Sequence, residues 1–146
     1  MELAKKGLGT TAPNPMVGCV IVHNNSIIGE GFTSPYGGPH AEVNAINSVK
    51  NRDLLKEASL YVTLEPCPMC AGLLVHSRVK RLVFAATDLK TGSAGSVFSL
   101  TNSDKLNHQL QVEYGVLQAE CAALLSNFFK RRRAEKKALK QANKNH

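Results

Sequence analysis

Residues 59–86 read SLYVTLEPCPMCAGLLVHSRVKRLVFAA, and this stretch predicts a strand, a helix and a second strand in succession. Residues 59–64 and 81–86 are apolar and rich in β-branched and aromatic side chains, which is typical of strands in a buried sheet. Residues 68–77 predict a helix that connects them. Alternation of strands and helices of this kind favours an α/β fold.

The same alternation extends to both sides of this stretch. Residues 17–22 (VGCVIV) and 26–32 predict two strands joined by a turn at residues 23–25, which is a hairpin. After residue 117, apolar residues recur at steps of four and three, which indicates an amphipathic helix. A hairpin followed by alternating helices and strands predicts a mixed sheet with helices on both faces. Strands are expected over residues 17–22, 26–32, 59–64, 81–86 and 110–114, and helices over residues 2–8, 40–50, 68–77 and from 117 onward.

Length and composition favour one compact cytoplasmic domain. The chain has 146 residues, of which 43% are hydrophobic, so it can bury a core of ordinary size. No apolar run approaches the roughly 18 residues that span a bilayer, and the first residues lack the apolar stretch of a secretory signal. We therefore expect a cytoplasmic protein with no membrane partner, whose four cysteines act as ligands, nucleophiles or core residues.

The positive charge is concentrated at the C-terminus. Residues 1–129 contain ten basic and ten acidic side chains, whereas residues 130–146 contain eight Lys or Arg and one acidic residue, Glu135. The whole net charge of +7 therefore lies in the last 17 residues. This distribution predicts a domain over residues 1–129 and a basic helical tail over residues 130–146 that binds a polyanion. The alternative is a solvated terminal helix without a partner.

His40, Cys67 and Cys70 are candidate ligands of a zinc ion. Cys67 and Cys70 are three residues apart at the start of an expected helix, where they share a face and where the helix end favours thiolates. His40, at the start of another expected helix, would add a neutral imidazole. Three protein ligands leave the fourth tetrahedral position open, as in catalytic zinc sites. We therefore predict one Zn²⁺ per chain.

Glu42, two residues after His40, is the candidate general base and acid. Its carboxylate would take a proton from the water that zinc activates and deliver it to a leaving amine. A C-x-x-C pair by itself also occurs in redox sites and structural zinc sites. The combination of His40-Ala41-Glu42 with Pro66-Cys67-Pro68-Met69-Cys70 is the signature of zinc nucleobase deaminases, and it gives His40 and Glu42 roles that thiol–disulfide exchange would leave unexplained.

The chain resembles two families that share these motifs. From residue 59, LYVTLEPCPMCAGLLVHSRVKRLVFAATDLKTGSAGSVF and LNHQLQVEYGVLQAECAALLSNFFKRRR resemble the bacterial tRNA adenosine deaminases. Within residues 1–50, AKKGLGTTAPNPMVGCVIV and GEGFTSPYGGPHAEVNAI resemble the pyrimidine deaminase domain of riboflavin biosynthesis. Both belong to the cytidine-deaminase-like superfamily, which implies a three-layer α/β/α sandwich around a five-stranded mixed sheet. The double resemblance predicts an engineered or recombined chimera.

The resemblance implies a hydrolase that acts on C–N bonds of a nucleobase and works as a homodimer. The first expected reaction is adenosine to inosine in a tRNA anticodon loop or in single-stranded nucleic acid. The alternatives are deamination of a free pyrimidine nucleotide of riboflavin biosynthesis and a non-catalytic RNA-binding or zinc-stabilised module. Asn14 matches the base-binding Asn of the riboflavin type, whereas Thr33 stands where the tRNA enzymes carry Asn. Substrate contacts are expected at Asn14, Thr33, Ala41, Asp88, Lys90, Arg131, Arg132 and Arg133.

Overall fold

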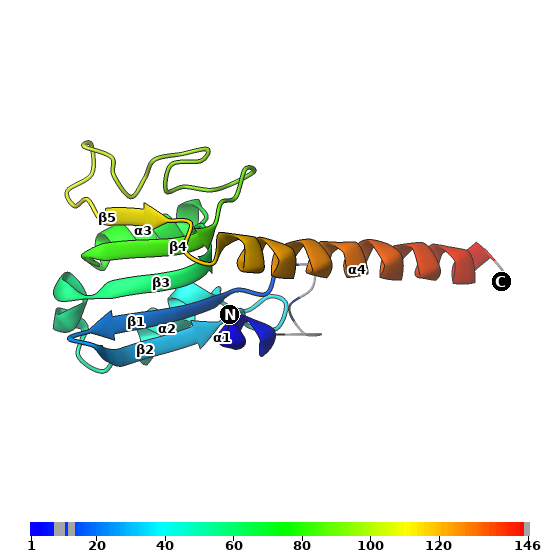
Figure 1. Cartoon of the computed structure of the whole chain (residues 1–146), viewed down its shortest axis with the longest axis horizontal. Coiled ribbons are helices and arrows are strands. Elements are labelled where there is room, and N and C mark those ends of the chain that lie inside the picture. The colour runs from blue at the N-terminus through cyan, green and yellow to red at the C-terminus, as the bar shows by residue number, and fades with distance from the viewer. Residues whose placement is uncertain (8–10, 12–13, 145–146) are drawn as a thin grey trace.

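A five-stranded mixed sheet forms the centre of the molecule in the computed structural model, which describes residues 1–7, 11 and 14–144. The strands lie in the order β2-β1-β3-β4-β5 (Figure 1). β1 is antiparallel to β2 and β3, whereas β3, β4 and β5 are parallel to one another. The expected α/β class, the hairpin and the mixed sheet are thus confirmed. The strands are β1 (Gly18–His23), β2 (Ser26–Phe32), β3 (Ser59–Leu64), β4 (Arg81–Ala86) and β5 (Gln111–Tyr114).

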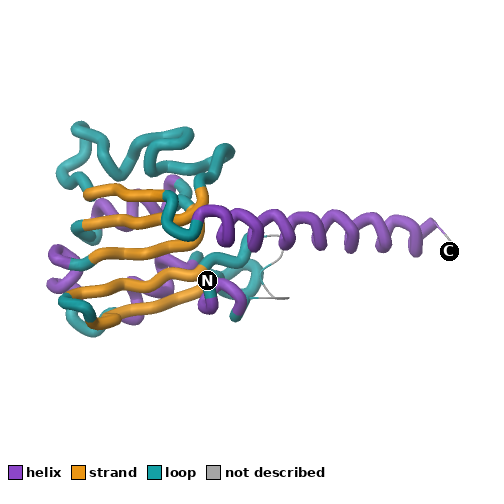
Figure 2. Tube along the Cα trace, viewed as in Figure 1, coloured by secondary structure: helices purple, strands orange, loops and turns teal. Residues whose placement is uncertain are grey.

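Two helices, α2 (Ala41–Ser48) and α3 (Pro68–His76), cover one face of the sheet (Figures 1 and 2). Between them and the strands lies the main core, in which Ile21, Leu60 and Leu74 are fully buried. Each such side chain contributes roughly 1.5–3 kcal/mol relative to an exposed one. Gly31 lets α2 lie directly against β2, because a Cβ at this position would stand 2.5 Å from the Ala45 amide nitrogen.

The opposite face is covered only in part, by α1 (Glu2–Lys5) and the first turns of α4 (Gln118–Lys144). These leave an apolar groove of about 340 Å³, lined in part by Val20, Tyr61 and Val83. Beyond Phe128, α4 has no buried side chain within the described residues, and it projects from the sheet as one long helix (Figure 1). Within residues 1–7, 11 and 14–144, no helix combines the length and apolar character needed to cross a membrane.

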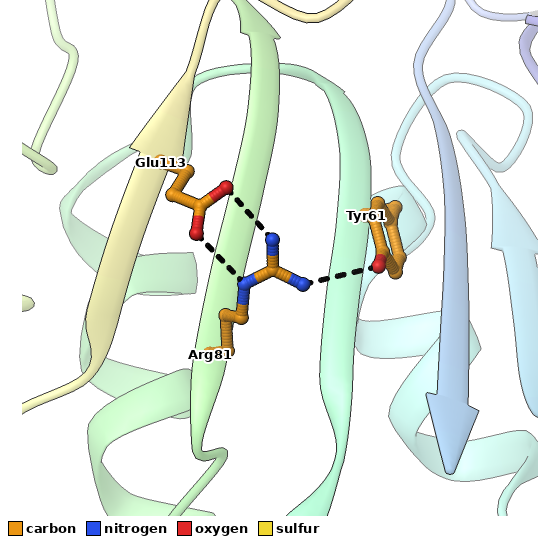
Figure 3. Close-up of polar contacts among 3 residues, drawn as sticks. All are labelled: Tyr61, Arg81 and Glu113. Carbon is orange, nitrogen blue, oxygen red and sulfur yellow. Dashed lines mark hydrogen bonds and ion pairs between the residues drawn. The ribbon is translucent and has the colours of Figure 1, made fainter. Parts of the chain in front are cut away.

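A polar cluster on this second face joins the three parallel strands (Figure 3). Arg81 in β4 donates from Nε and Nη2 to the two carboxylate oxygens of Glu113 in β5, at 3.2 and 2.7 Å. Its Nη1 donates to the Tyr61 hydroxyl in β3 at 3.2 Å. Because β5 has only four residues, this bidentate contact supplements a short backbone ladder at the edge of the sheet.

The observed helices differ from the expected ones mainly at their ends. The helix expected over residues 40–50 spans Ala41–Ser48, because Val49 is extended. A 3₁₀ helix, η1 (Arg52–Glu57), was not expected; the Asn51 side chain accepts a hydrogen bond from the Asp53 amide at its start. The helix expected over residues 2–8 appears as α1, and residue 8 lies outside the described residues.

Candidate metal centre and substrate cavity

His40 and Cys67 each stand immediately before a helix, at the end of the sheet where β3 ends. His40 is the N-cap of α2 and Cys67 the N-cap of α3, and both have extended backbone conformations. Cys70 follows in the first turn of α3. Asn44 in α2 donates to the Phe32 carbonyl and the Ser34 hydroxyl, at 2.9 and 2.8 Å, and so holds the loop that leads to His40.

The three predicted metal ligands form one cluster. His40 Nδ1 lies 3.7 Å from Cys67 Sγ and 3.4 Å from Cys70 Sγ, and the three ligand atoms lie within 4.8 Å of one another. Tetrahedral zinc with Zn–N of about 2.05 Å and Zn–S of about 2.3 Å would separate N and S by about 3.6 Å. The donor set and its spacing therefore fit zinc, with His40 presenting Nδ1.

Hydrogen bonding and burial shift the acid–base behaviour of this cluster. The pKa of Cys67 is lowered to about 5, chiefly because the Cys70 thiol donates a hydrogen bond to its sulfur. The same interaction, together with burial, raises the pKa of Cys70. The pair therefore keeps one thiolate near neutral pH. A half-buried thiolate beside an imidazole is a strong ligand for a soft or borderline divalent metal.

Glu42 lies in the first turn of α2 and its side chain is buried. Burial is the main cause that raises its pKa, and the Cys70 thiol interacts with its carboxylate by a hydrogen bond. On an ideal helix, residues two positions apart in the sequence, such as 40 and 42, point about 200° apart. His40 is not helical, and for this reason His40 and Glu42 can both line the same cavity.

The cavity beside the cluster has a volume of about 140 Å³. Pockets for drug-sized ligands begin at about 300 Å³, so this cavity suits a single heteroaromatic ring rather than a whole nucleotide. It opens at the carboxyl ends of the parallel strands, where open α/β sheets generally bind ligands. Its lining consists of Asn14, Pro15, Val17, Thr33, His40, Glu42, Leu64, Glu65, Cys67, Asp88 and Thr91.

Three of the expected substrate contacts line this cavity: Asn14, Thr33 and Asp88. The Thr33 hydroxyl accepts a hydrogen bond from the Val17 amide at 3.0 Å and donates to the Pro15 carbonyl at 3.1 Å. Thr33 thus fixes the segment that presents Asn14. Asp88 Oδ1 accepts from the backbone amides of Lys90 and Thr91, at 2.9 and 3.2 Å, which shapes its own loop.

The other expected contacts lie elsewhere. Ala41 is fully buried in the main core, and Lys90 is exposed. Arg131, Arg132 and Arg133 lie on the projecting part of α4. Glu65 and Thr91 also line the cavity, although the sequence does not predict them as site residues. Glu65 stands two residues before Cys67, and a charged residue at the end of a buried strand was the available signal.

The larger groove on the opposite sheet face is a poorer candidate for the reaction site. It is mainly apolar, and of the His, Cys, Asp and Glu side chains the structure describes, only the cluster at His40 has the spacing of a metal site. The smaller cavity, where three candidate metal ligands and a buried carboxylate meet, is therefore the better candidate for the reaction site.

Comparisons with known proteins show the family of the chain. The family model "Cytidine and deoxycytidylate deaminase zinc-binding region" matches residues 1–86. A tRNA-specific adenosine deaminase of Haemophilus influenzae is 48% identical over 132 residues, covering 83% of this chain and 75% of that protein. Both resemblances also appear among solved structures.

Acinetobacter baumannii RibD has a TM-score of 0.74 and 38% identity, covering 88% of this chain but only 36% of that one. A structure described as a tRNA:A34 deaminase of A-to-I editing at the wobble position has a TM-score of 0.70 and 27% identity, covering 85% of this chain and 94% of that one. The riboflavin-type match is thus confined to about a third of its protein, whereas the tRNA-type matches extend over most of theirs.

Proposed function

Because the chain belongs to the zinc-binding family of cytidine and deoxycytidylate deaminases, and with it to the tRNA-specific adenosine deaminases, we propose that it converts adenosine to inosine in the loop of a tRNA. The reaction is hydrolysis at C6 of adenine: water adds, the exocyclic amine leaves as ammonia, and a carbonyl remains. Zinc, when bound, supplies the Lewis acidity that activates water near neutral pH.

The residues of the cavity have separate tasks in this proposal. His40, Cys67 and Cys70 hold the metal, and their 3.4–3.7 Å N–S distances support that assignment. The Glu42 carboxylate takes one proton from water and delivers it to the ring nitrogen. It then takes the proton of the hydroxyl that has been added to the ring carbon and delivers it to the departing amine, so that ammonia leaves and a carbonyl remains. Asn14 hydrogen-bonds the edge of the base, and the apolar side chains of Val17 and Leu64 limit the access of water.

The meeting of Glu42 with the His40–Cys67–Cys70 cluster in a cavity for one ring carries the proposal. A cavity of this size requires the base to leave its stack, because the sugar and phosphate must remain outside. To test it, the zinc-loaded chain is incubated with a stem-loop RNA that has adenosine in the loop. Inosine in the loop supports the proposal. Deamination of a free aminopyrimidine nucleotide without inosine would overturn it.

A second candidate substrate is a free pyrimidine nucleotide, which is what the riboflavin-type resemblance favours. Asn14 lines the cavity, and Thr33 both lines it and fixes the segment from Pro15 to Val17. If the chain is a chimera of the two families, its first 50 residues supply the side of the cavity that contains Asn14 and Thr33, and residues 59 onward supply the segment with Cys67 and Cys70. An Asn14→Ala variant separates binding of the base from binding of the metal. A raised KM with retained zinc supports Asn14 as a base contact.

We also propose that the tail over residues 130–146 holds the RNA backbone. At 100° per residue, five cations of α4 fall within an arc of about 80° and extend over about 21 Å. They are Lys130, Arg133, Lys137, Lys140 and Lys144. All five are exposed, and none has an ion-pair partner among the described residues. We call this row the cation ladder.

The ion pairs of Glu135 also support RNA binding by the ladder, because they neutralise cations outside it. Its carboxylate pairs with Arg131 at 3.6 Å and with Arg132 at 3.2 Å. Arg133 is therefore the member of the Arg131–Arg133 run that faces along the ladder. A row of unpaired charge on one side of a helix suits a phosphate backbone better than an evenly charged helix does.

Matched triple variants test the ladder. Replacing Arg133, Lys137 and Lys140 by Ala removes three ladder cations, and replacing Arg131, Arg132 and Lys136 removes three cations beside it. We expect the first variant to bind stem-loop RNA at least about tenfold more weakly than the second. With each phosphate contact that is lost, fewer counterions are released from the RNA on binding, and the affinity falls. Equal losses would show that charge number, not its arrangement, determines binding.

A cytoplasmic homodimer completes the proposal. The resemblance supports a dimer, and several large apolar side chains near the cavity loops are exposed: Tyr36, Met69, Leu89 and Phe98. Sedimentation equilibrium at micromolar concentration measures the mass directly. A mass equal to one chain of 15.8 kDa would contradict the dimer and leave the assignment of the cavity unaffected.

A further inference from the structure

One wall of the substrate cavity belongs to residues 88–98, which have little regular structure. Asp88 and Thr91 from this segment line the cavity. The segment folds on itself: the Gly92 amide donates to the Asp88 carbonyl at 3.0 Å, and the Phe98 amide donates to the Gly92 carbonyl at 3.0 Å. These bonds give the wall its shape, but its position relative to the metal cluster needs contacts outside the segment.

Two hydrogen bonds attach the wall to the residues just before Cys67. The Ser93 amide donates to the Pro66 carbonyl at 2.9 Å. The Ser96 hydroxyl donates to Glu65 Oε1 at 2.8 Å. The Glu65 side chain therefore joins the segment that leads to the metal ligands with the middle of the wall, 31 residues later in the sequence.

Glu65 is an unusual residue for a purely structural contact, because only 3% of it is exposed. Its Oε2 is buried and has no hydrogen-bond partner among the described residues. This oxygen faces Gly92, where an added Cβ would overlap it. A side chain at position 92 would collide with the carboxylate, so glycine is needed there for the wall to pack directly on Glu65. Burying a carboxylate oxygen without a hydrogen-bond partner lowers the stability of the fold. Two apolar side chains packed at the same place would not have this cost.

We propose that Glu65 is a positioning residue that fixes the wall of residues 88–98, and with it Asp88 and Thr91, at the mouth of the substrate cavity. The inference rests on the proposed deaminase activity. Asp88 and Thr91 line the cavity that takes the base, so the wall to which they belong meets the substrate there. His40 and Cys67 are the N-caps of α2 and α3, and Glu42 and Cys70 lie in the first turns of these helices. The Ser93–Pro66 bond beside Cys67 is made by backbone atoms and does not involve the Glu65 side chain. Loss of Glu65 should therefore weaken substrate binding more than it slows the chemical step.

Side-chain variants at the two ends of this contact give the first test. For Glu65→Ala we expect a KM about tenfold higher and a kcat within threefold of the wild type, at an unchanged zinc content. Ser96→Ala should raise KM in the same direction. Glu65→Gln keeps an oxygen that can accept the Ser96 bond, so its KM should stay within twofold. Ser99→Ala is the matched control, because Ser99 is exposed in the same loop and its hydroxyl makes no hydrogen bond to any residue that the structure describes.

A pair of glycine variants gives an independent test. Gly92→Ala places a methyl group against both the Glu65 carboxylate and the Asp88 carbonyl oxygen and should raise KM, whereas Gly72→Ala adds one where nothing lies within 4 Å. Only the contact with Glu65 is relieved when Glu65 is also replaced. In the double variant Glu65→Ala/Gly92→Ala the methyl group occupies the space of the lost carboxylate. Its KM should therefore be no higher than that of Gly92→Ala alone. Residues that share one contact deviate from additivity in this way.

Hydrogen exchange measures the wall without any substrate. The Val97 and Phe98 amides bond to the Gly92 carbonyl, and they should exchange faster in Glu65→Ala and Ser96→Ala than in Ser99→Ala. Unchanged exchange together with a KM within twofold, in variants that retain zinc, would overturn the inference. If Glu65→Ala does not fold, Ser96→Ala and the Gly92→Ala comparison decide. KM is measured on the substrate that the wild type deaminates, so an unexpected substrate refutes the proposed function and not this inference.

Discussion

Glu42 and the metal ligands have different tasks, and single substitutions should separate them. We predict that Glu42→Gln lowers kcat by about 10²–10⁴-fold, because an amide cannot take the proton from water. Zinc should stay at one per chain, since His40, Cys67 and Cys70 are unchanged. Ammonia release and elemental analysis of the same sample measure both quantities. Glu30→Gln, on an exposed strand position, is the control. Full activity of Glu42→Gln would remove Glu42 from the reaction.

Removing one metal ligand should release the zinc, in contrast to the substitution of Glu42, which should leave the zinc bound. We predict that Cys70→Ser loses zinc and, with it, all activity, because a hydroxyl is a much weaker ligand than a thiolate at neutral pH. Cys121→Ser provides a comparison, because Cys121 is also a buried thiol but lies in a separate apolar cluster. That variant should lose some stability and keep its metal. Zinc retained in Cys70→Ser would contradict the proposed ligand set.

At this scale the sequence predicts the residues of motifs well and their distant partners poorly. Cys67 and Cys70 are expected from their spacing at a helix start, and His40 from the combination of His40-Ala41-Glu42 with that pair. The Glu65–Ser96 bond has no such signal, since the two residues are 31 positions apart and one lies in an irregular loop. By contrast, the pairing of Glu135 with Arg131 and Arg132, rather than Arg133, follows from helical spacing, because residues three and four apart share a face and residues two apart do not.

Among the secondary-structure elements, the edge strand β5 depends on one ion pair for part of its attachment. Arg81 holds the pKa of the Glu113 carboxyl below its usual value through two hydrogen bonds. A folded-state pKa that is lowered adds stability above the unfolded pKa of about 4.3, and that stability is lost as the pH falls through the folded value.

We therefore predict that Glu113→Gln lowers the urea midpoint at pH 7 and that the difference from the wild type shrinks as the pH falls below the unfolded pKa of about 4.3 and through the lower folded value. Urea unfolding at a series of pH values measures it. The exposed Glu30→Gln should show no such pH-dependent difference. A Glu113→Gln deficit that persists unchanged in acid would mean that packing, rather than the ion pair, holds β5.

Strands are easier to predict from this sequence than helix boundaries. The five strands have β-branched or apolar runs, and all five were expected within one residue of their observed ends. The 3₁₀ helix η1 was missed, because RDLLKE has a mixed polar pattern and its cap, Asn51, resembles a turn residue. The end of α2 depends on Val49 turning into an extended conformation, which tertiary packing decides.

At the scale of the whole molecule, α4 connects a neutral catalytic body to a basic arm. The helix begins at the end of the sheet where β3 and β4 end, the same end that holds the cavity (Figure 1). Its buried residues, Cys121 and Phe128, precede the cation ladder, so the part of the helix that packs on the sheet and the part proposed to bind RNA are different.

This division predicts the behaviour of a chain that ends after Phe129. The shortened chain should fold and keep its zinc, because no described residue beyond Phe128 is buried. Its affinity for stem-loop RNA should fall, and so should the dependence of that affinity on salt. Five lost phosphate contacts reduce the slope of log K against log salt by about 3.5, taking about 0.7 per contact on a single strand. Fluorescence anisotropy between 50 and 200 mM salt measures both slopes. An unchanged slope would place the RNA elsewhere on the molecule, whereas an unchanged rate on a free nucleotide would show that the cavity itself is intact.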